Sequence, residues 1–180
     1  MTVTAAAGMA GTTIEAVCAE AGLSKRYFYE HFRSRDQLFA ALAGGLIEQI
    51  VAGAIEFVRS GRDLQERFRA ASSWVVTFLA DDPRRAKVFV DAIGNGHLYA
   101  TVGRAERNLA QLVVDEITRD TNVSADQRAR QYVVTVVLVT GAAQAVTDWL
   151  DGSSGLTLDD LVDTVANLSA AAIRTVQPDL

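Results

Sequence analysis

The sequence of 180 residues contains few cysteines, histidines and prolines. Its single cysteine, Cys18, excludes an internal disulfide framework and a metal site built from cysteines alone. The two histidines, His31 and His97, are far apart in the sequence, so a zinc site would lack its usual ligands, and we expect no metal and no cofactor. The N-terminus has no basic segment before an apolar one, so it does not resemble a secretory signal, and we expect a cytoplasmic protein.

The scarcity of prolines and of strand signals predicts an all-α fold. Prolines occur only at Pro83 and Pro178, and the Asn95-Gly96 and Asp151-Gly152 pairs lie between helical patterns rather than strands. Apolar spacing and capping residues predict helices over about 13–21, 24–32, 35–59, 63–79, 83–93, 97–119, 124–150 and 157–176. Gly44-Gly45 interrupts the third of these, and there we place the boundary between an N-terminal module, 1–44, and a C-terminal domain, 45–180.

The net charge of −5 hides a basic segment near the N-terminus. Residues 1–40 sum to zero, so the remaining residues carry the whole deficit. Within residues 24–35, Lys25, Arg26, Arg33 and Arg35 stand against Glu30 alone. A polyanion would meet this local patch rather than the average charge of the chain.

The basic segment lies in a helix-turn-helix pattern. Residues 12–38 read as two short helices around a tight turn, Ala21-Gly-Leu-Ser24, in which Ser24 can cap the second helix. In such motifs the second helix enters the major groove of DNA while the first braces it. A basic cluster on a helix is more often only a solvated face, and for Arg33 we keep that interpretation, but the turn directly before Lys25 and Arg26 favours DNA contact.

The segment AGLSKRYFYEHF followed by RSRDQLF resembles the N-terminal module of TetR-type transcriptional regulators. The resemblance is continuous over about thirty residues, whereas the rest of the chain is similar only in its all-helical layout. It implies that Thr13 and Arg35 contact phosphates and that Tyr29 and His31 contact the DNA backbone. Helix geometry makes Lys25, Arg26 and Tyr27 the candidates to reach base edges. The predicted DNA-binding set is therefore Thr13, Ser24, Lys25, Arg26, Tyr27, Tyr29, His31 and Arg35.

Only eleven residues precede Thr12, and Gly8 and Gly11 are among them. TetR-type modules carry a full helix at this place, so the sequence predicts that this first helix is short or missing. Without it, Phe28, Phe32 and their neighbours would lose part of their cover, which would make the module loose and its DNA binding weak. Cys18 reads most simply as a small buried apolar residue, and His31 could instead satisfy a neighbour within the module.

The helix at 132–150 is apolar on all sides and must be covered. Its length suits a membrane span, but Gln144 and Asp148 argue against one, so we expect no membrane contact. The best cover is the same helix pair of a second copy, which gives a homodimer through a four-helix interface. The predicted interface comprises Val139, Ala143 and Val146 on one helix and Leu161, Val165, Leu168 and Ala172 on the other.

The family resemblance also implies an effector pocket in the C-terminal domain. We assign it to aromatic and polar residues there: Trp74, Phe78, Phe89, Asn95, Tyr99, Tyr132 and Gln144, with His97 and Trp149 beside them. No catalytic set or phosphate-binding loop is recognisable, so we expect no enzyme. The sequence thus predicts a homodimeric regulator, most often a repressor in such families, that binds a palindromic operator of double-stranded DNA and is released by a small, mostly apolar effector. The alternative is a helical small-molecule binding protein with a vestigial DNA-binding module.

Overall fold

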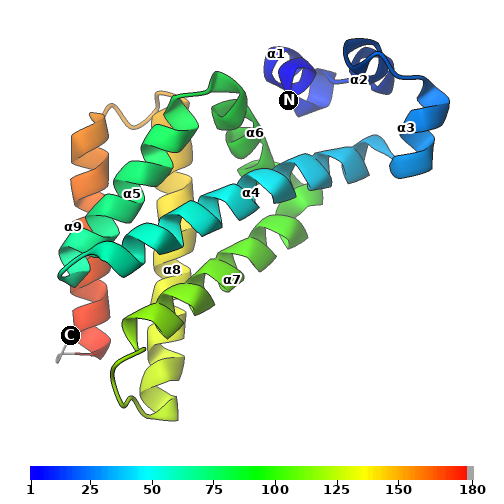
Figure 1. The fold of residues 1–180 in the computed structure, drawn as a ribbon. Coiled ribbons are helices and arrows are strands. Elements are labelled where there is room, and N and C mark those ends of the chain that lie inside the picture. Colours follow the sequence, from blue (N-terminus) through cyan, green and yellow to red (C-terminus); the bar gives the residue numbers. More distant parts are fainter. Residues whose placement is uncertain (178–180) are drawn as a thin grey trace.

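The computed structural model describes residues 1–177, apart from the side chain of Ala5. This part of the chain is all helical and has no strand, which confirms the predicted fold class (Figure 1). The helices are α1 (Thr2–Gly11), α2 (Ile14–Ala21), α3 (Lys25–His31), α4 (Arg35–Ser60), α5 (Leu64–Ala80), α6 (Pro83–Ile93), the single 3-10 turn η1 (Gly96–Leu98), α7 (Tyr99–Ile117), α8 (Ala125–Leu150) and α9 (Leu158–Val176).

Side-chain caps fix where most of these helices begin. Ser24, Ser34 and Ser124 each accept a hydrogen bond from the backbone N–H three residues later, as do Asp63 and Thr157. At Ser124 the capping box is complete, because the Gln127 side chain also accepts from the Ser124 N–H. These starts agree with the sequence because capping depends on residues close together along the chain.

The first helix is short and kinked. Residues 2–11 form α1, so the first helix is present but short, which is one of the two alternatives that the sequence predicted. Gly8 breaks the helix with a φ of 67°, a left-handed value that suits glycine, and the chain resumes helical geometry at Met9. Met9 is buried, and α1 packs chiefly against α6.

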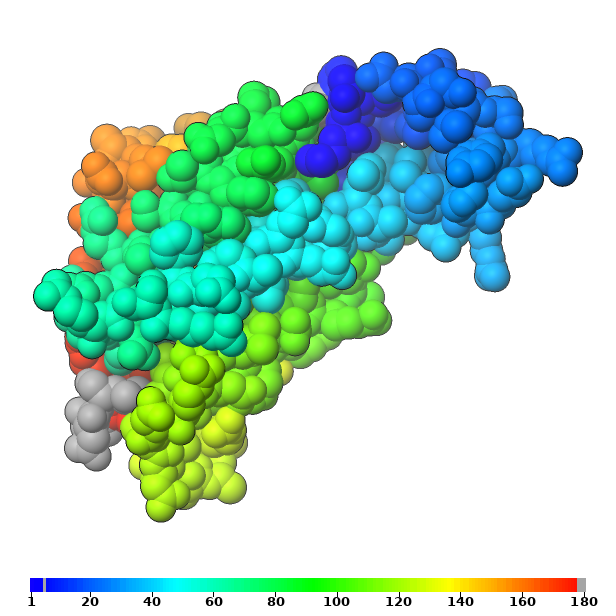
Figure 2. Space-filling model, viewed as in Figure 1, coloured from blue at the N-terminus to red at the C-terminus, as the bar shows by residue number. Residues whose placement is uncertain are grey.

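One long helix joins the two ends of the molecule. In Figure 1, α4 starts beside the small group formed by α2 and α3 and then crosses the bundle of α5, α7, α8 and α9. Gly44 and Gly45 lie inside this continuous helix, so the predicted division at residue 44 falls within an element that both parts share. The space-filling view shows the N-terminal part projecting from the bundle (Figure 2).

Two apolar clusters hold the bundle together. One lies around Leu46, Val76 and Val88, where α4, α5 and α6 meet, and the other lies around Val58, Val113 and Ile173 at the far end of α4. Gly53 of α4 is required for the close approach of α5, because a Cβ there would lie 2.0 Å from Cη2 of Trp74.

Candidate nucleic-acid interface and ligand cavity

The second helix of the helix-turn-helix, α3, presents its polar side chains to solvent. Gly22 takes the left-handed conformation (φ 65°) that ends α2, and the Ser24 side chain accepts from the Tyr27 N–H at 3.2 Å to begin α3. Phe28 is buried beneath the helix, whereas Lys25 and Arg26 are exposed. The short helix is therefore anchored by its apolar face and leaves its basic first turn accessible.

Both basic residues of that first turn have acidic partners. Lys25 pairs with Glu15 of α2, and Arg26 Nε lies 3.2 Å from Glu30 Oε1 in α3. The hydrogen bond from Lys25 holds the pKa of the Glu15 carboxyl below its usual value and raises the pKa of Lys25. These pairs are solvent-exposed, and the Arg26 side chain is 91% exposed, so they hold the side chains only weakly and can exchange for phosphate or base contacts.

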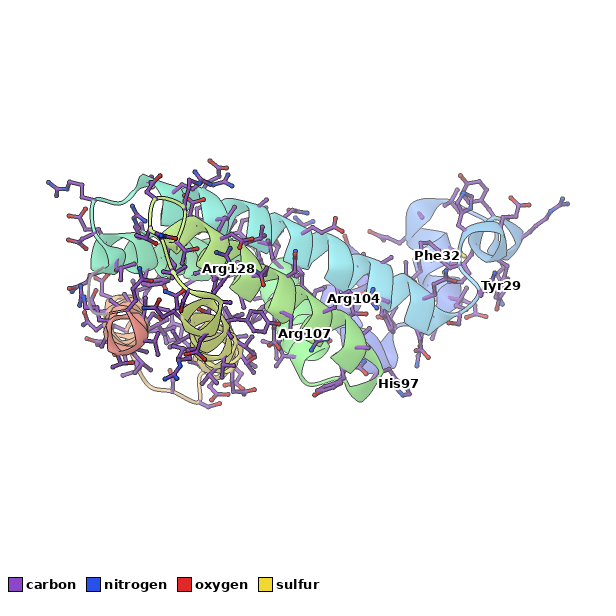
Figure 3. The ribbon with its side chains drawn as sticks, turned by 90° about the horizontal axis from the view of Figure 1, so that it is seen from below. Tyr29, Phe32, His97, Arg104, Arg107 and Arg128 are labelled. Carbon is purple, nitrogen blue, oxygen red and sulfur yellow. The ribbon has the colours of Figure 1, made fainter. Side chains whose placement is uncertain are left out.

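The remaining expected DNA-binding residues lie on the same end of the molecule. Thr13 caps α2 by accepting from the Ala16 N–H at 3.1 Å and is exposed. Tyr27, Tyr29 and His31 are exposed too, and Figure 3 shows Tyr29 at this end. His31 also fits the alternative that it satisfies a neighbour within the module, because its Nδ1 lies 3.1 Å from the Tyr27 carbonyl oxygen and its ring packs at a tilt against Tyr27.

Arg35 has a structural position. Its guanidinium donates to the carbonyl oxygens of Ala10 at 3.3 Å and Thr12 at 3.0 Å, and it lies over the Phe39 ring. It therefore ties the end of α1 to the start of α4. If Arg35 contacts a DNA phosphate, it does so in addition to linking α1 to α4.

The helix-turn-helix module has incomplete apolar cover. A hollow lies between α2 and α3, and its walls include Val17, Cys18, Phe28 and Phe32. The loss of cover expected from a short first helix thus has a structural counterpart, because α1 packs on α6 rather than on α3. Cys18 is buried, in keeping with a small apolar role.

The C-terminal bundle contains an elongated apolar cavity of about 170 Å³. Its walls come from α4, α5, α6, α7, α8 and α9 and include Leu46, Ile50, Phe89, Leu138 and Val162. The lining residues of α4 run from Ala43 to Val58, a span of about 22 Å at the helical rise per residue. A cavity of this shape suits a long apolar ligand better than a compact polar one.

Polar groups are rare on the cavity wall. Among the lining residues of the described chain they are Ser72, Thr135, Ser169 and Glu106, and Glu106 is the one charged side chain. Its Oε2 accepts a hydrogen bond from the Thr140 hydroxyl at 3.1 Å, which links α7 to α8. Glu106 is half-buried.

The cavity wall differs from the set of pocket residues that we expected. Phe89 lines it, but Trp74, Phe78, Asn95, Tyr99, Tyr132 and Gln144 do not. Trp74 and Phe78 stack on each other, Asn95 caps η1, and Gln144 donates to Asp148. Tyr99 is 80% exposed, and the neighbouring candidates His97 and Trp149 also lie off the wall. The aliphatic stripe of α4 that forms the wall was visible in the sequence, but its regular spacing fits an ordinary core equally well.

The expected dimer residues divide between the inside and the outside of the chain. Val146 and Leu161 are 5% and 2% exposed and lie within the bundle, so they cannot contact a second copy, and assigning them to the interface is wrong. Val139, Ala143 and Val165 line the cavity, Ala172 is half-buried, and Leu168 is 62% exposed. On α8 the exposed apolar residues are instead Val133 and Val137. Which side of α8 faces a second copy stays a prediction, because this helix is apolar nearly all round and periodicity alone does not select one side.

The described residues 1–177 contain no group of three or more His, Cys, Asp or Glu side chains that could hold a metal ion. The helices α4 and α8 are long and apolar enough to cross a membrane by length and composition, which by itself is weak evidence, since core helices meet the same criteria.

Comparison with known proteins identifies the module. The family model described as "Bacterial regulatory proteins, tetR family" matches residues 1–42, which are α1, α2, α3 and the start of α4. The N-terminal module is that of the TetR family. The chain is 28% identical over 160 residues to the HTH-type transcriptional activator FasR of Mycolicibacterium smegmatis, and the match covers 88% of this chain and 69% of FasR.

Solved structures share the fold over nearly the whole chain. The transcriptional regulator FadR of Bacillus subtilis, solved in complex with stearoyl-CoA, matches with a TM-score of 0.72 and 16% identity, covering 96% of this chain and 94% of FadR. A TetR-like transcriptional regulator from Rhodococcus sp. RHA1 matches with a TM-score of 0.65 and 22% identity, over 97% of this chain and 90% of its own. The TetR fold of this chain therefore extends through the C-terminal bundle.

Proposed function

We propose that this protein is a homodimeric, ligand-responsive transcriptional regulator whose effector carries a long acyl chain. The observation that carries the proposal is the course of α4. This helix begins directly after the exposed recognition helix α3, from which only the short loop 32–34 separates it, and further along it lines the apolar cavity. A ligand in the cavity thus contacts the same rigid element that positions the DNA-binding module.

DNA binding is supported by the exposed first turn of α3. Lys25 and Arg26 extend from an exposed helix, the major groove is wide enough to admit an α-helix, and arginine can read guanine through two hydrogen bonds. Two copies would place their recognition helices roughly 34 Å apart on a palindromic operator. We propose that the unliganded dimer represses the adjacent genes by occupying this operator.

The dimer is supported by apolar side chains that remain exposed on α8 and α9. Val137 is 67% exposed and Leu168 is 62% exposed, on two helices that pack side by side. Large exposed apolar residues on neighbouring helices are typical of a surface that a partner covers. A twofold arrangement of these helices would bury the surface and fix the spacing of the two recognition helices.

The acyl effector is supported by the shape and chemistry of the cavity. Its wall is almost wholly aliphatic and extends along α4, which suits an extended hydrocarbon chain. FadR of Bacillus subtilis, which shares the fold, was solved with stearoyl-CoA. We therefore propose a long-chain acyl compound as the effector.

Helix α6 provides the second connection between cavity and module. Phe89, Ala92 and Ile93 of α6 line the cavity, while Asp91 accepts a hydrogen bond from the Met9 N–H of α1 at 2.9 Å. A ligand that moves α6 would therefore move α1. By thermodynamic linkage, the effector must weaken DNA binding by the same factor by which DNA weakens effector binding.

We further propose that α4 and α8 are core helices of a cytoplasmic, non-enzymatic regulator. Both helices pack in the bundle and line the cavity. The alternative, a small-molecule binding protein with a vestigial DNA-binding module, draws support from the hollow between α2 and α3. The accessible basic turn of α3 favours the regulator.

The test is fluorescence anisotropy with the purified protein and a labelled fragment of DNA flanking its own gene, at low salt. The wild type is expected to bind this fragment, and the double variant Lys25→Ala, Arg26→Ala is expected to lose at least about tenfold in affinity. Arg174→Ala is the matched control, because Arg174 is an exposed arginine at the far end of α9. Absence of DNA binding by the wild type would contradict the proposed regulatory function. It would favour the alternative, a small-molecule binding protein with a vestigial DNA-binding module.

A further inference from the structure

The exposed face of the recognition helix α3 carries an acidic residue, Glu30, beside the basic Arg26. These two residues lie two positions after and two positions before the buried Phe28. At about 3.6 residues per turn, both lie about 160° around α3 from Phe28. They therefore share the face that points directly away from the apolar anchor of the helix, and this is the face that meets base edges when a helix lies in the major groove.

Glu30 contacts only one edge of the Arg26 guanidinium. Arg26 Nε lies 3.2 Å from Glu30 Oε1, and within residues 1–177 neither Nη1 nor Nη2 of Arg26 has a hydrogen-bond partner. The donors of a guanidinium lie in a planar fork, so the edge formed by Nη1 and Nη2 remains complete. Guanine presents N7 and O6 in the major groove, and this edge can donate to both acceptors at once.

The ion pair of Lys25 differs from that of Arg26. Its partner Glu15 lies on α2, and the Lys25 ammonium is a compact charge without a planar edge. Glu15 therefore competes for the same donor group that a base or a phosphate would use. Of the two basic residues in the first turn of α3, Arg26 is the one whose acidic partner leaves a complete recognition edge free.

The charge of Glu30 also distinguishes bases from phosphates. A carboxylate beside Arg26 leaves the pair with no net charge, so the pair attracts a phosphate less than a lone arginine would. A base edge is uncharged, and its hydrogen bonds with Nη1 and Nη2 do not depend on the net charge of the pair. Where the groove partly excludes water, the ion pair with Nε becomes stronger and holds the guanidinium in place.

Building on the proposed operator binding, we infer that Glu30 is a specificity-determining residue of the DNA interface. It positions Arg26 so that Nη1 and Nη2 read one guanine in each operator half-site, and it lowers the affinity of the same arginine for phosphates. Glu30 thus increases the ratio of operator affinity to the affinity for other DNA.

The test compares the affinities of the full-length protein for two duplexes, measured by fluorescence anisotropy. One duplex is the operator that the wild type selects from a pool of random sequences, and the other is a scrambled duplex of the same length and composition. Glu30→Gln keeps the length of the side chain and removes its charge. This variant is expected to bind the scrambled duplex more tightly, with a salt dependence that is steeper by about one phosphate contact per protomer. Its ratio of operator to scrambled affinity should fall at least about fivefold.

Two further variants show whether Glu30 acts through Arg26. Glu20→Gln makes the same chemical change at an exposed carboxylate of α2 that forms no ion pair within residues 1–177, and it should retain the wild-type ratio. In the background of Arg26→Ala, adding Glu30→Gln should leave the ratio unchanged. Replacing the guanine that Arg26 reads by 7-deazaguanine, which lacks N7, should weaken operator binding by the wild type but not by Arg26→Ala.

The outcomes separate this inference from the proposal beneath it. If the wild type selects no common sequence from the pool, the regulator itself is wrong and the inference falls with it. If the wild type selects an operator but Glu30→Gln keeps the wild-type ratio, operator binding stands and the assignment to Glu30 is overturned. If Glu30→Gln weakens binding of both duplexes by the same factor, Glu30 only stabilises α3, which also overturns the inference.

Discussion

The backbone N–H of Met9 in α1 donates to the Asp91 carboxylate of α6 over 2.9 Å, directly after the break in α1 at Gly8. Asp91 also pairs with Lys87 one turn earlier in α6. A carboxylate of α6 thus accepts from the first backbone N–H after the break in α1. Helix α6 also lines the ligand cavity. The contact between Met9 and Asp91 is therefore a second connection between the DNA-binding module and the effector domain, in addition to α4.

Removing this acceptor is predicted to weaken the coupling between ligand and DNA. Asp91→Ala should retain binding of palmitoyl-CoA and of the operator fragment, measured separately, but the ligand should lower the DNA affinity by a smaller factor than in the wild type. Asp91→Asn, which keeps an acceptor for the Met9 N–H but loses the ion pair with Lys87, should behave more like the wild type. An Asp91→Ala protein with full coupling would show that α6 acts through other contacts.

Gly53 is predicted to be intolerant of a side chain. A Cβ at Gly53 would overlap the Trp74 ring, so Gly53→Ala should lower the free energy of unfolding by ~1–3 kcal/mol through overpacking between α4 and α5. Gly45→Ala in the same helix is the control. No atom lies within 4 Å of a Cβ there, so this change should stabilise the protein by up to about 1 kcal/mol. Urea denaturation measures both, and equal effects would contradict the packing of Trp74 on Gly53.

Asp82, the N-cap of α6, is predicted to contribute to acid sensitivity. The side-chain and backbone hydrogen bonds from Arg84 lower the pKa of Asp82 from its usual 3.8 to about 2. Because the carboxylate is favoured in the folded state, its stabilisation is complete above pH 3.8 and is lost as the pH falls through about 2. The difference in unfolding free energy between the wild type and Asp82→Asn should therefore shrink between about pH 5 and pH 2. A difference that is constant over this range would contradict the assigned pKa.

The exposed face of α8 and α9 is predicted to hold the dimer together. Val137→Glu puts a charge on this face, and the charge occurs twice in a twofold interface. The variant should therefore be a monomer in sedimentation experiments. Operator affinity should fall with it, because one recognition helix cannot span two half-sites. Tyr99→Glu, at a large residue that is 80% exposed outside this face, should remain dimeric. A dimeric Val137→Glu protein would place the interface elsewhere.

The sequence predicted what depends on neighbours along the chain. Ser24, Ser34 and Ser124 cap helices as expected because a cap needs only a side chain and a backbone N–H three residues on. Gly8 and Gly11 predict that the first helix is short or missing, and the structure has a short one that is helical on both sides of Gly8. Asp91, far away in sequence, accepts from the Met9 N–H directly after the break. Such a long-range contact leaves no local signal.

The cavity and the dimer face were harder to predict because they depend on how helices rotate against each other. Aromatic residues such as Trp74 and Phe78 attracted the pocket assignment, yet they stack outside a wall made of aliphatic side chains. Val146 and Val137 belong to the same apolar helix, and only packing decides that the first is buried and the second exposed. Periodicity identifies an apolar stripe but cannot say which part of it faces a neighbour.

The central claim is that occupation of the cavity and binding of DNA oppose each other. The most direct test is the affinity of the wild-type dimer for its operator fragment, measured by fluorescence anisotropy with and without saturating palmitoyl-CoA. The ligand is predicted to weaken DNA binding by about 5–150-fold, the usual range of allosteric coupling. The same operator affinity with and without the ligand, at a concentration shown to fill the cavity, would contradict it.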